Sequence, residues 1–177
     1  MLNRLLPTLA AIIVLSACAP QRKPLPAPPP PAAAPRPVAT ATPAPPPADW
    51  RDAPVSPGTW RYEVAEGSSA ARFGLVAGAP LATLTCDRAA SQVALRRAGA
   101  APSPVPLTIT TSTATRAFTA TPEAGPIPQL VLVLAARDPV LDAMAFSRGR
   151  FVIEVAGLPT LYLPARPEVG RLIEDCR

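Results

Sequence analysis

Proline is distributed so unevenly along this chain of 177 residues that it restricts where a folded domain can begin. Thirteen of the 27 prolines lie within residues 20–48, a span of only 29 residues. Proline locks its own φ and biases the preceding residue toward extended backbone. The same span has few large apolar side chains and no aromatic ones, so it cannot bury enough surface to offset the entropy of ordering. We therefore predict a disordered tether over residues 18–49 and one globular β-rich domain over residues 50–177.

The tether is interpreted as a spacer. At about 3.1 Å per residue, its residues from 19 to 49 would reach on the order of 95 Å at full extension. The stretch PAPPPP at residues 26–31 also contains P-x-x-P spacings. A docking site for a proline-recognition module, or a path through the cell-wall mesh, is therefore the alternative interpretation.

The first 17 residues have the parts of an export signal. Arg4 supplies a positive start, and an apolar segment runs from Leu5 to Leu15 with only Pro7 and Thr8 interrupting it. The segment is shorter than the ~20 apolar residues that a membrane-spanning helix needs. We therefore predict that residues 1–17 are a cleaved signal peptide.

The end of this signal resembles the lipobox of bacterial lipoproteins: Leu15, Ser16 and Ala17 precede Cys18. The resemblance implies that the Cys18 thiol receives a diacylglycerol, that the signal is cut before it, and that the new amine is acylated, for example with palmitate. Ala19 follows the cysteine, which by the same resemblance implies the periplasmic face of the outer membrane. The alternative is an ordinary secretory signal with a chance cysteine.

Two cysteines remain once Cys18 is assigned to lipid. Because an exported chain meets an oxidising compartment, Cys86 and Cys176 are predicted to form a disulfide. The alternative is a pair of buried free thiols.

The domain has the pattern of a mainly β protein. Short runs of alternating polarity are separated by turn residues, which is typical of an antiparallel sandwich or small barrel. We expect roughly nine short strands, over residues 59–66, 69–76, 80–87, 91–97, 107–113, 116–120, 129–136, 150–155 and 160–165.

Two short helices are expected, the last at the C-terminus. Asp138 and Pro139 form a good N-cap and N1 pair ahead of residues 140–147, and Pro167 with Glu168 begins a segment of helical apolar spacing. Residues 149–177, GRFVIEVAGLPTLYLPARPEVGRLIEDCR, are similar to the tail of small uncharacterised lipoproteins of proteobacterial envelopes. That resemblance implies two strands, a helix and a bridged cysteine, and it brings no catalytic residue.

Charge argues against nucleic acid as a partner. The formal charge is +5, but residues 50–177 contain 13 arginines and 11 acids, which leaves about +2. A nucleic-acid footprint needs cations clustered on one face.

The sequence lacks the side chains of most catalytic sites. It contains no histidine, and its single lysine, Lys23, lies in the tether. Ser-His-Asp, Cys-His and Ser-Lys arrangements are therefore excluded from the domain. The chain also has too few cysteines for a zinc site made of cysteines. We expect no enzyme activity, no metal and no cofactor.

Two kinds of candidate site remain. Carboxylate pairs of the kind that glycosidases use are Asp138 with Asp142, and Glu174 with Asp175, although helix capping and solvated charge explain both. The second is SRGR at residues 147–150, in which Arg148 and Arg150 can bind an anion in a forked geometry, while Gly149 is also explained as a helix end.

These observations predict a lipid-anchored cell-envelope protein that presents a non-catalytic β domain to a protein or cell-wall partner. The alternatives are a carboxylate-dependent glycan hydrolase and a β-barrel that carries a small apolar ligand.

Overall fold

The computed structural model describes residues 49–177. The predicted signal peptide, the lipidation site Cys18 and nearly all of the predicted tether lie outside the described residues. Within the described part, the prediction of a mainly β fold with two short helices is confirmed.

Nine antiparallel strands form a single sheet in the order β1-β2-β3-β4-β7-β6-β5-β8-β9. β7 is therefore the central strand of the sheet. The strands are β1 (Thr59–Ala65), β2 (Ser68–Gly74), β3 (Ala82–Asp87), β4 (Gln92–Ala98), β5 (Val105–Thr110), β6 (Thr115–Glu123), β7 (Gln129–Ala135), β8 (Arg150–Val155) and β9 (Leu161–Pro164).

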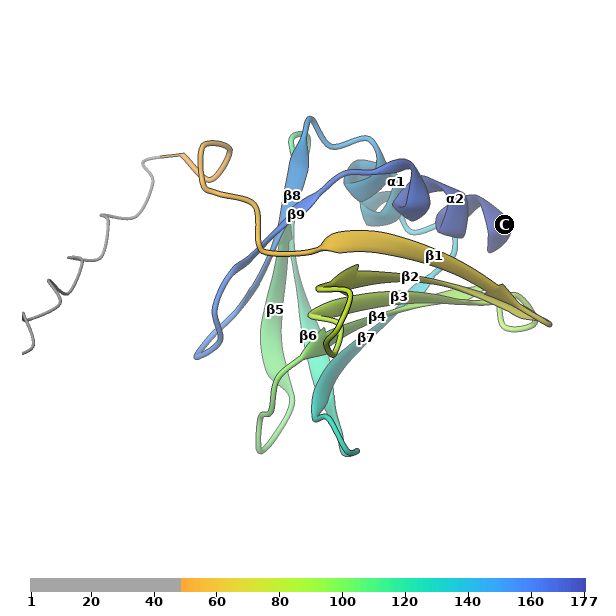
Figure 1. Ribbon diagram of the computed structural model, residues 1–177, viewed down its shortest axis with the longest axis horizontal. Helices are drawn as coiled ribbons and strands as arrows, with labels where there is room; N and C mark the ends of the chain where they lie inside the picture. Colours follow the sequence, from red (N-terminus) through yellow and green to blue (C-terminus); the bar gives the residue numbers. More distant parts are fainter. Residues whose placement is uncertain (1–48) are drawn as a thin grey trace, which may run out of the picture. The chain divides into compact units, whose positions relative to one another are not determined.

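The sheet is bent into two parts that meet at β6 (Figure 1). Residues 115–120 of this strand pair with β5, whereas residues 121–123 pair with β7. β1, β2, β3, β4 and β7 form one part, and β5, β8 and β9 rise steeply from it.

The two outermost strands, β1 and β9, approach each other without closing the sheet into a barrel. Just before β1, the backbone N–H of Ser56 donates to the carbonyl of Tyr162 at 2.9 Å, and the N–H of Tyr162 donates to Oγ of Ser56 at 3.0 Å. The indole Nε1 of Trp60 donates to the carbonyl of Pro164 at 2.8 Å. The hydrogen bonds of Ser56 and Trp60 thus hold the two edge strands together, although no ladder of strand-to-strand hydrogen bonds joins them.

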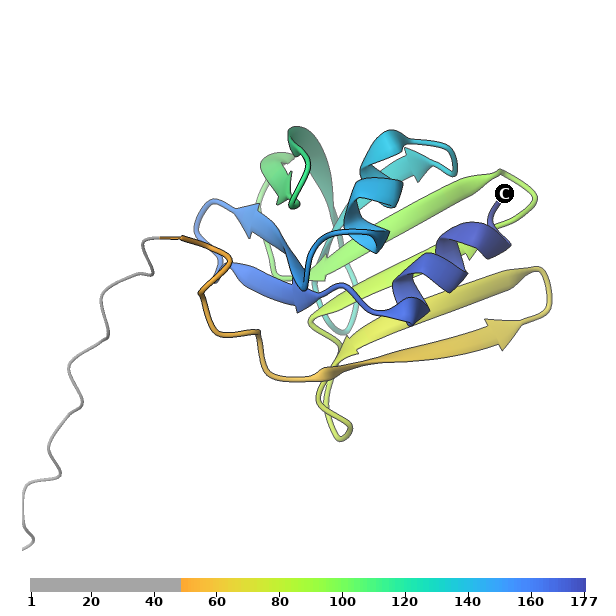
Figure 2. The same ribbon diagram turned by 90° about the horizontal axis from the view of Figure 1, so that it is seen from above.

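The helices α1 (Pro139–Ala145) and α2 (Pro167–Asp175) lie side by side over one face of the sheet (Figure 2). Asp138 caps α1 as predicted, because its side chain accepts from the Val140 N–H. The apolar face of α2 buries Val169, Leu172 and Ile173 against β1, β2 and β3.

The predicted disulfide is present in the structure. Cys86, on the inward face of β3, is bonded to Cys176 at the end of α2. Both residues are buried, so the bridge fastens the C-terminal helix to the sheet from inside the core.

One charged residue, Arg97, lies on the inward face of β4 and is only 5% exposed. Its guanidinium donates to the carbonyl of Pro159 at 2.8 Å and to that of Ala98. Burial lowers the pKa of Arg97 below its ordinary value because the charged form loses hydration. No ion pair between Arg97 and an acid is found in residues 49–177.

Candidate functional site: a polar groove on the outer face of the sheet

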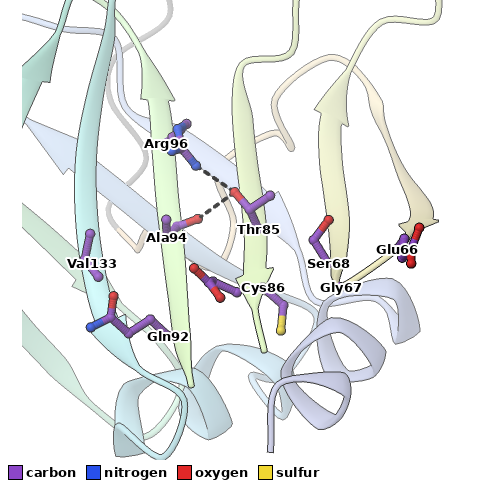
Figure 3. Close-up of a pocket in the computed structure, with 10 residues that line it drawn as sticks. Glu66, Gly67, Ser68, Thr85, Cys86, Gln92, Ala94, Arg96 and Val133 are labelled. Atoms are coloured by element: carbon purple, nitrogen blue, oxygen red, sulfur yellow. Dashed lines mark hydrogen bonds between the residues drawn. The ribbon is translucent and has the colours of Figure 1, made fainter. Parts of the chain in front are cut away.

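A groove of about 540 Å³ crosses the face of the sheet opposite the helices (Figure 3). Successive residues of a strand point to opposite faces, so the outward positions of β2, β3, β4 and β7 form its surface. It is lined by Glu66, Gly67, Ser68, Thr85, Cys86, Asp87, Gln92, Ala94, Arg96 and Val133.

Small side chains explain why the sheet is hollowed here. Ala94 lies opposite Thr85 on one side and Val133 on the other, and Ser68 lies opposite Asp87. An alanine or serine leaves space that longer neighbours surround. Cys86 lines the groove only from below, because its sulfur points toward the helices (Figure 3).

Arg96 is held in a fixed orientation at one end of the groove. Its Nη1 donates to Oγ1 of Thr85 at 2.7 Å, and its Nε donates to Oε2 of Glu123 at 3.1 Å. Two anchoring hydrogen bonds restrict the rotamers of a long side chain, so less entropy remains to be lost when a ligand binds.

The opposite end of the groove is acidic. Glu66 lies in the turn between β1 and β2, and Asp87 ends β3, where its Oδ1 accepts from the N–H of Ala90 at 3.0 Å. With the guanidinium of Arg96 paired to Glu123 at the far end and hydroxyl and amide groups between, the groove is polar along its length and acidic at one end. Such a surface matches an extended polar ligand that carries both donors and acceptors.

The residues predicted to bind an anion lie elsewhere, beyond the end of α1. Arg148 is exposed in the loop before β8, and Arg150 is the half-buried first residue of that strand. Nη1 of Arg150 is buried and has no hydrogen-bond partner within residues 49–177. An anion would supply the missing acceptor, and the anion site stays a prediction. Gly149, with φ of 79°, lies beyond the helix C-cap at Phe146, so it does not end α1.

Three of the four carboxylates in the predicted pairs make structural contacts. Besides capping α1, Asp138 accepts from Arg116 at 2.6 Å, and Asp142 accepts from Arg177 at 2.8 Å. Asp175 accepts from the hydroxyl of Tyr62. Glu174 is exposed at the other side of α2, in a depression between the two helices.

No cluster of three or more His, Cys, Asp or Glu side chains suited to a metal ion occurs in residues 49–177. The described helices are also too short to span a membrane.

Sequence reasoning did not find the groove. Its polar residues are ordinary strand residues when taken one at a time, and nothing local marks Thr85 or Gln92. The available signal was the small outward residue Ala94 among longer ones, but its neighbours are set by strand pairing between distant segments. The comparisons with known proteins found no matching family model, curated protein or solved structure, so the site is argued from its own geometry.

Proposed function

We propose that this chain is a lipid-anchored protein of the cell envelope whose β domain binds a protein or cell-wall partner without catalysis. The outer-face groove is the proposed binding surface. A groove with fixed polar groups, an acidic end and small residues in its floor suits an extended polar chain better than a compact apolar molecule.

The proposal of a lipid anchor rests on the number of cysteines. The chain has three, and the disulfide uses Cys86 and Cys176. Cys18 is the one that remains, and it directly follows the lipobox-like Leu15, Ser16 and Ala17. A buried disulfide also agrees with an oxidising compartment such as the periplasm.

The anchor is tested by metabolic labelling with palmitate in a Gram-negative host. The native chain is expected to incorporate label and to fractionate with membranes, whereas Cys18→Ser is expected to do neither. Cys86→Ser serves as the control, because it also removes one cysteine but leaves the lipobox intact; since it breaks the disulfide, only its labelling is compared. Equal labelling of the native and Cys18→Ser chains would refute the anchor.

A glycan hydrolase is the second candidate, because Glu66 and Asp87 are two carboxylates lining one groove. Glu66→Gln and Asp87→Asn keep the shape of each side chain and remove its charge. If the native chain released soluble fragments from purified cell wall and either variant did not, glycan hydrolysis would replace non-catalytic binding as the proposed function.

The third candidate, a carrier of small apolar ligands, has less support. A carrier needs an interior cavity, but large side chains including Phe73, Phe151 and Leu84 fill the space between the sheet and the helices. We therefore favour the groove over the interior as the site of binding.

A further inference from the structure

The two ends of the sheet differ in the charge of their loops. Four loops meet at one end, which we call the apolar end: residues 75–81, 99–104, 124–128 and 156–160. None of them contains a charged residue, and only Ser103 and Thr160 are polar. The loops at the opposite end contain Glu66, Arg88, Arg137, Asp138, Arg148 and Arg166.

Contacts at their bases link these loops to one another. The N–H of Gly99 donates to the carbonyl of Pro128 at 3.0 Å, and the N–H of Ala98 donates to that of Leu81 at 3.0 Å. Gly99 also lies against the side chain of Leu158, so closely that an added Cβ would be 2.5 Å from it. All four loops are thus fastened together at the same end of the sheet.

Large apolar side chains are exposed on this surface. Leu75 is 61% exposed, Val76 is 86% exposed, and Ile127 is 46% exposed. Two adjacent large apolar residues exposed at a hairpin tip, in a loop without charge, would gain free energy if an apolar surface covered them.

A cation lies beside these side chains. Nη1 of Arg61 donates to the carbonyls of Gly74 at 3.4 Å and Leu75 at 3.3 Å. Within residues 49–177, no ion pair joins Arg61 to an acid. An apolar tip with a guanidinium at its base matches the boundary between acyl chains and anionic headgroups.

We propose that the apolar end inserts shallowly into the bilayer to which the chain is anchored, with Leu75 and Val76 among the acyl chains and Arg61 at the headgroup phosphates. This inference rests on the proposed lipid anchor, which would hold the domain at a high local concentration near the bilayer. The predicted tether, with a reach of ~95 Å, would keep the domain at roughly millimolar effective concentration near the membrane, so weak insertion would suffice.

The small area of the patch favours a bilayer over a second copy of the chain. Three partly exposed aliphatic side chains offer on the order of 300 Å², well below the roughly 800 Å² per partner of a standard protein interface. The point at which the chain enters the sheet is consistent with this orientation. Gly58, just before β1, packs against Gly74 at the apolar end.

The test measures quenching of tryptophan fluorescence by lipids brominated on their acyl chains. The chain from Cys18 onward, without the predicted signal peptide, is coupled through the Cys18 thiol to a maleimide lipid in vesicles of phosphatidylcholine and phosphatidylglycerol. Val76→Trp places an indole at the apolar end, and Val64→Trp, at a position 60% exposed near the opposite end of the sheet, is the matched control. The native chain gives the background of Trp50 and Trp60.

The added indole of Val76→Trp is expected to lose most of its emission in brominated vesicles, and that of Val64→Trp to lose none. Quenching of neither indole, or of both equally, would overturn the proposal; in the first case, gel filtration would then test for a second copy. Chemical coupling makes the result independent of cellular lipidation, so failure of insertion and failure of the anchor are read from different experiments. Unchanged urea midpoints would show that both variants are folded.

Discussion

Trp60 and Pro164 are 104 residues apart in sequence, yet the indole of the first donates a 2.8 Å hydrogen bond to the carbonyl of the second. Trp60 lies on β1 and Pro164 on β9, the two outermost strands of the sheet. The same indole packs against Phe73 and Phe151, with ring centroids at 5.3 Å and 6.5 Å. Trp60 therefore joins the two parts of the bent sheet in both its polar and its apolar contacts.

Trp60→Phe is expected to lower the free energy of unfolding by roughly 1–3 kcal/mol, because it leaves the Pro164 carbonyl without its donor and opens space beside the two phenylalanines. Urea denaturation followed by circular dichroism measures the loss. Trp50→Phe, on a half-buried residue near the first described position, is the control and should cost much less. Equal losses would contradict the bridging role of Trp60.

Removal of the disulfide is expected to lower stability more than any exposed substitution. The bond joins residues 90 apart, for which the chain-entropy model gives roughly 4–5 kcal/mol. The double variant Cys86→Ala, Cys176→Ala, compared with the native chain in urea, measures this cost. Adding a reductant should move the native midpoint toward that of the variant and leave the variant unchanged. A variant as stable as the native chain would contradict a structural role for the bridge.

Gly58→Ala is expected to be strongly destabilising, because an added Cβ would lie 2.6 Å from the backbone of Gly74 and the residue has φ of 135°. We expect a loss of roughly 2–4 kcal/mol from the combined strain and contact. Gly67→Ala is the matched control: φ is also positive, at 73°, but nothing lies within 4 Å of the added atom. It should cost only about 1 kcal/mol. A similar loss for both would show that crowding at Gly74 is unimportant.

Arg97→Lys is expected to make the free energy of unfolding change with pH in the alkaline range. Burial lowers the pKa of the cation at this position, and lysine ordinarily titrates near 10.4, far below arginine. The folded variant would lose its proton at a lower pH than the unfolded chain, so the unfolded state would bind more protons. Stability of the variant should therefore rise as pH increases toward 10.4.

The native chain is the control for that measurement, because arginine stays charged over the same range. The readout is the difference in urea midpoint between the two proteins at pH 7 and pH 10. A difference that does not change with pH would mean that the cation at position 97 is solvated in the folded protein.

Much of the fold could be predicted because its signals are local. Strand positions follow from alternation, and Asp138 with Pro139 marks the start of α1 through its own hydrogen bonding. The disulfide was predicted from the two cysteines that remain beside Cys18 in an exported chain, and it is present. The strands and the helix start need only a few neighbouring residues, and the disulfide needs only a count.

The rest depends on contacts between distant segments. β7 is inserted between β4 and β6, which no local pattern indicates, and this order sets the residues beside Ala94 in the groove. The apolar run of β7 did not show that Val133 faces solvent at 53% exposure. Arg97 reads as a surface residue beside Arg96, but the strand alternation turns it into the core.

If the groove of the anchored domain binds a partner, in-cell photo-crosslinking from inside the groove should capture that partner. A photoreactive amino acid replaces the exposed Gln92 in the groove, or the exposed Thr113 in the turn between β5 and β6 as the control. Ala94→Arg, which fills the groove from its floor, is the blocking variant. We expect a discrete adduct from position 92 that is absent at position 113 and lost both with Ala94→Arg and in the unanchored Cys18→Ser chain. Adducts that are the same from both positions, or that persist when the groove is filled, would show that the groove is not the binding surface.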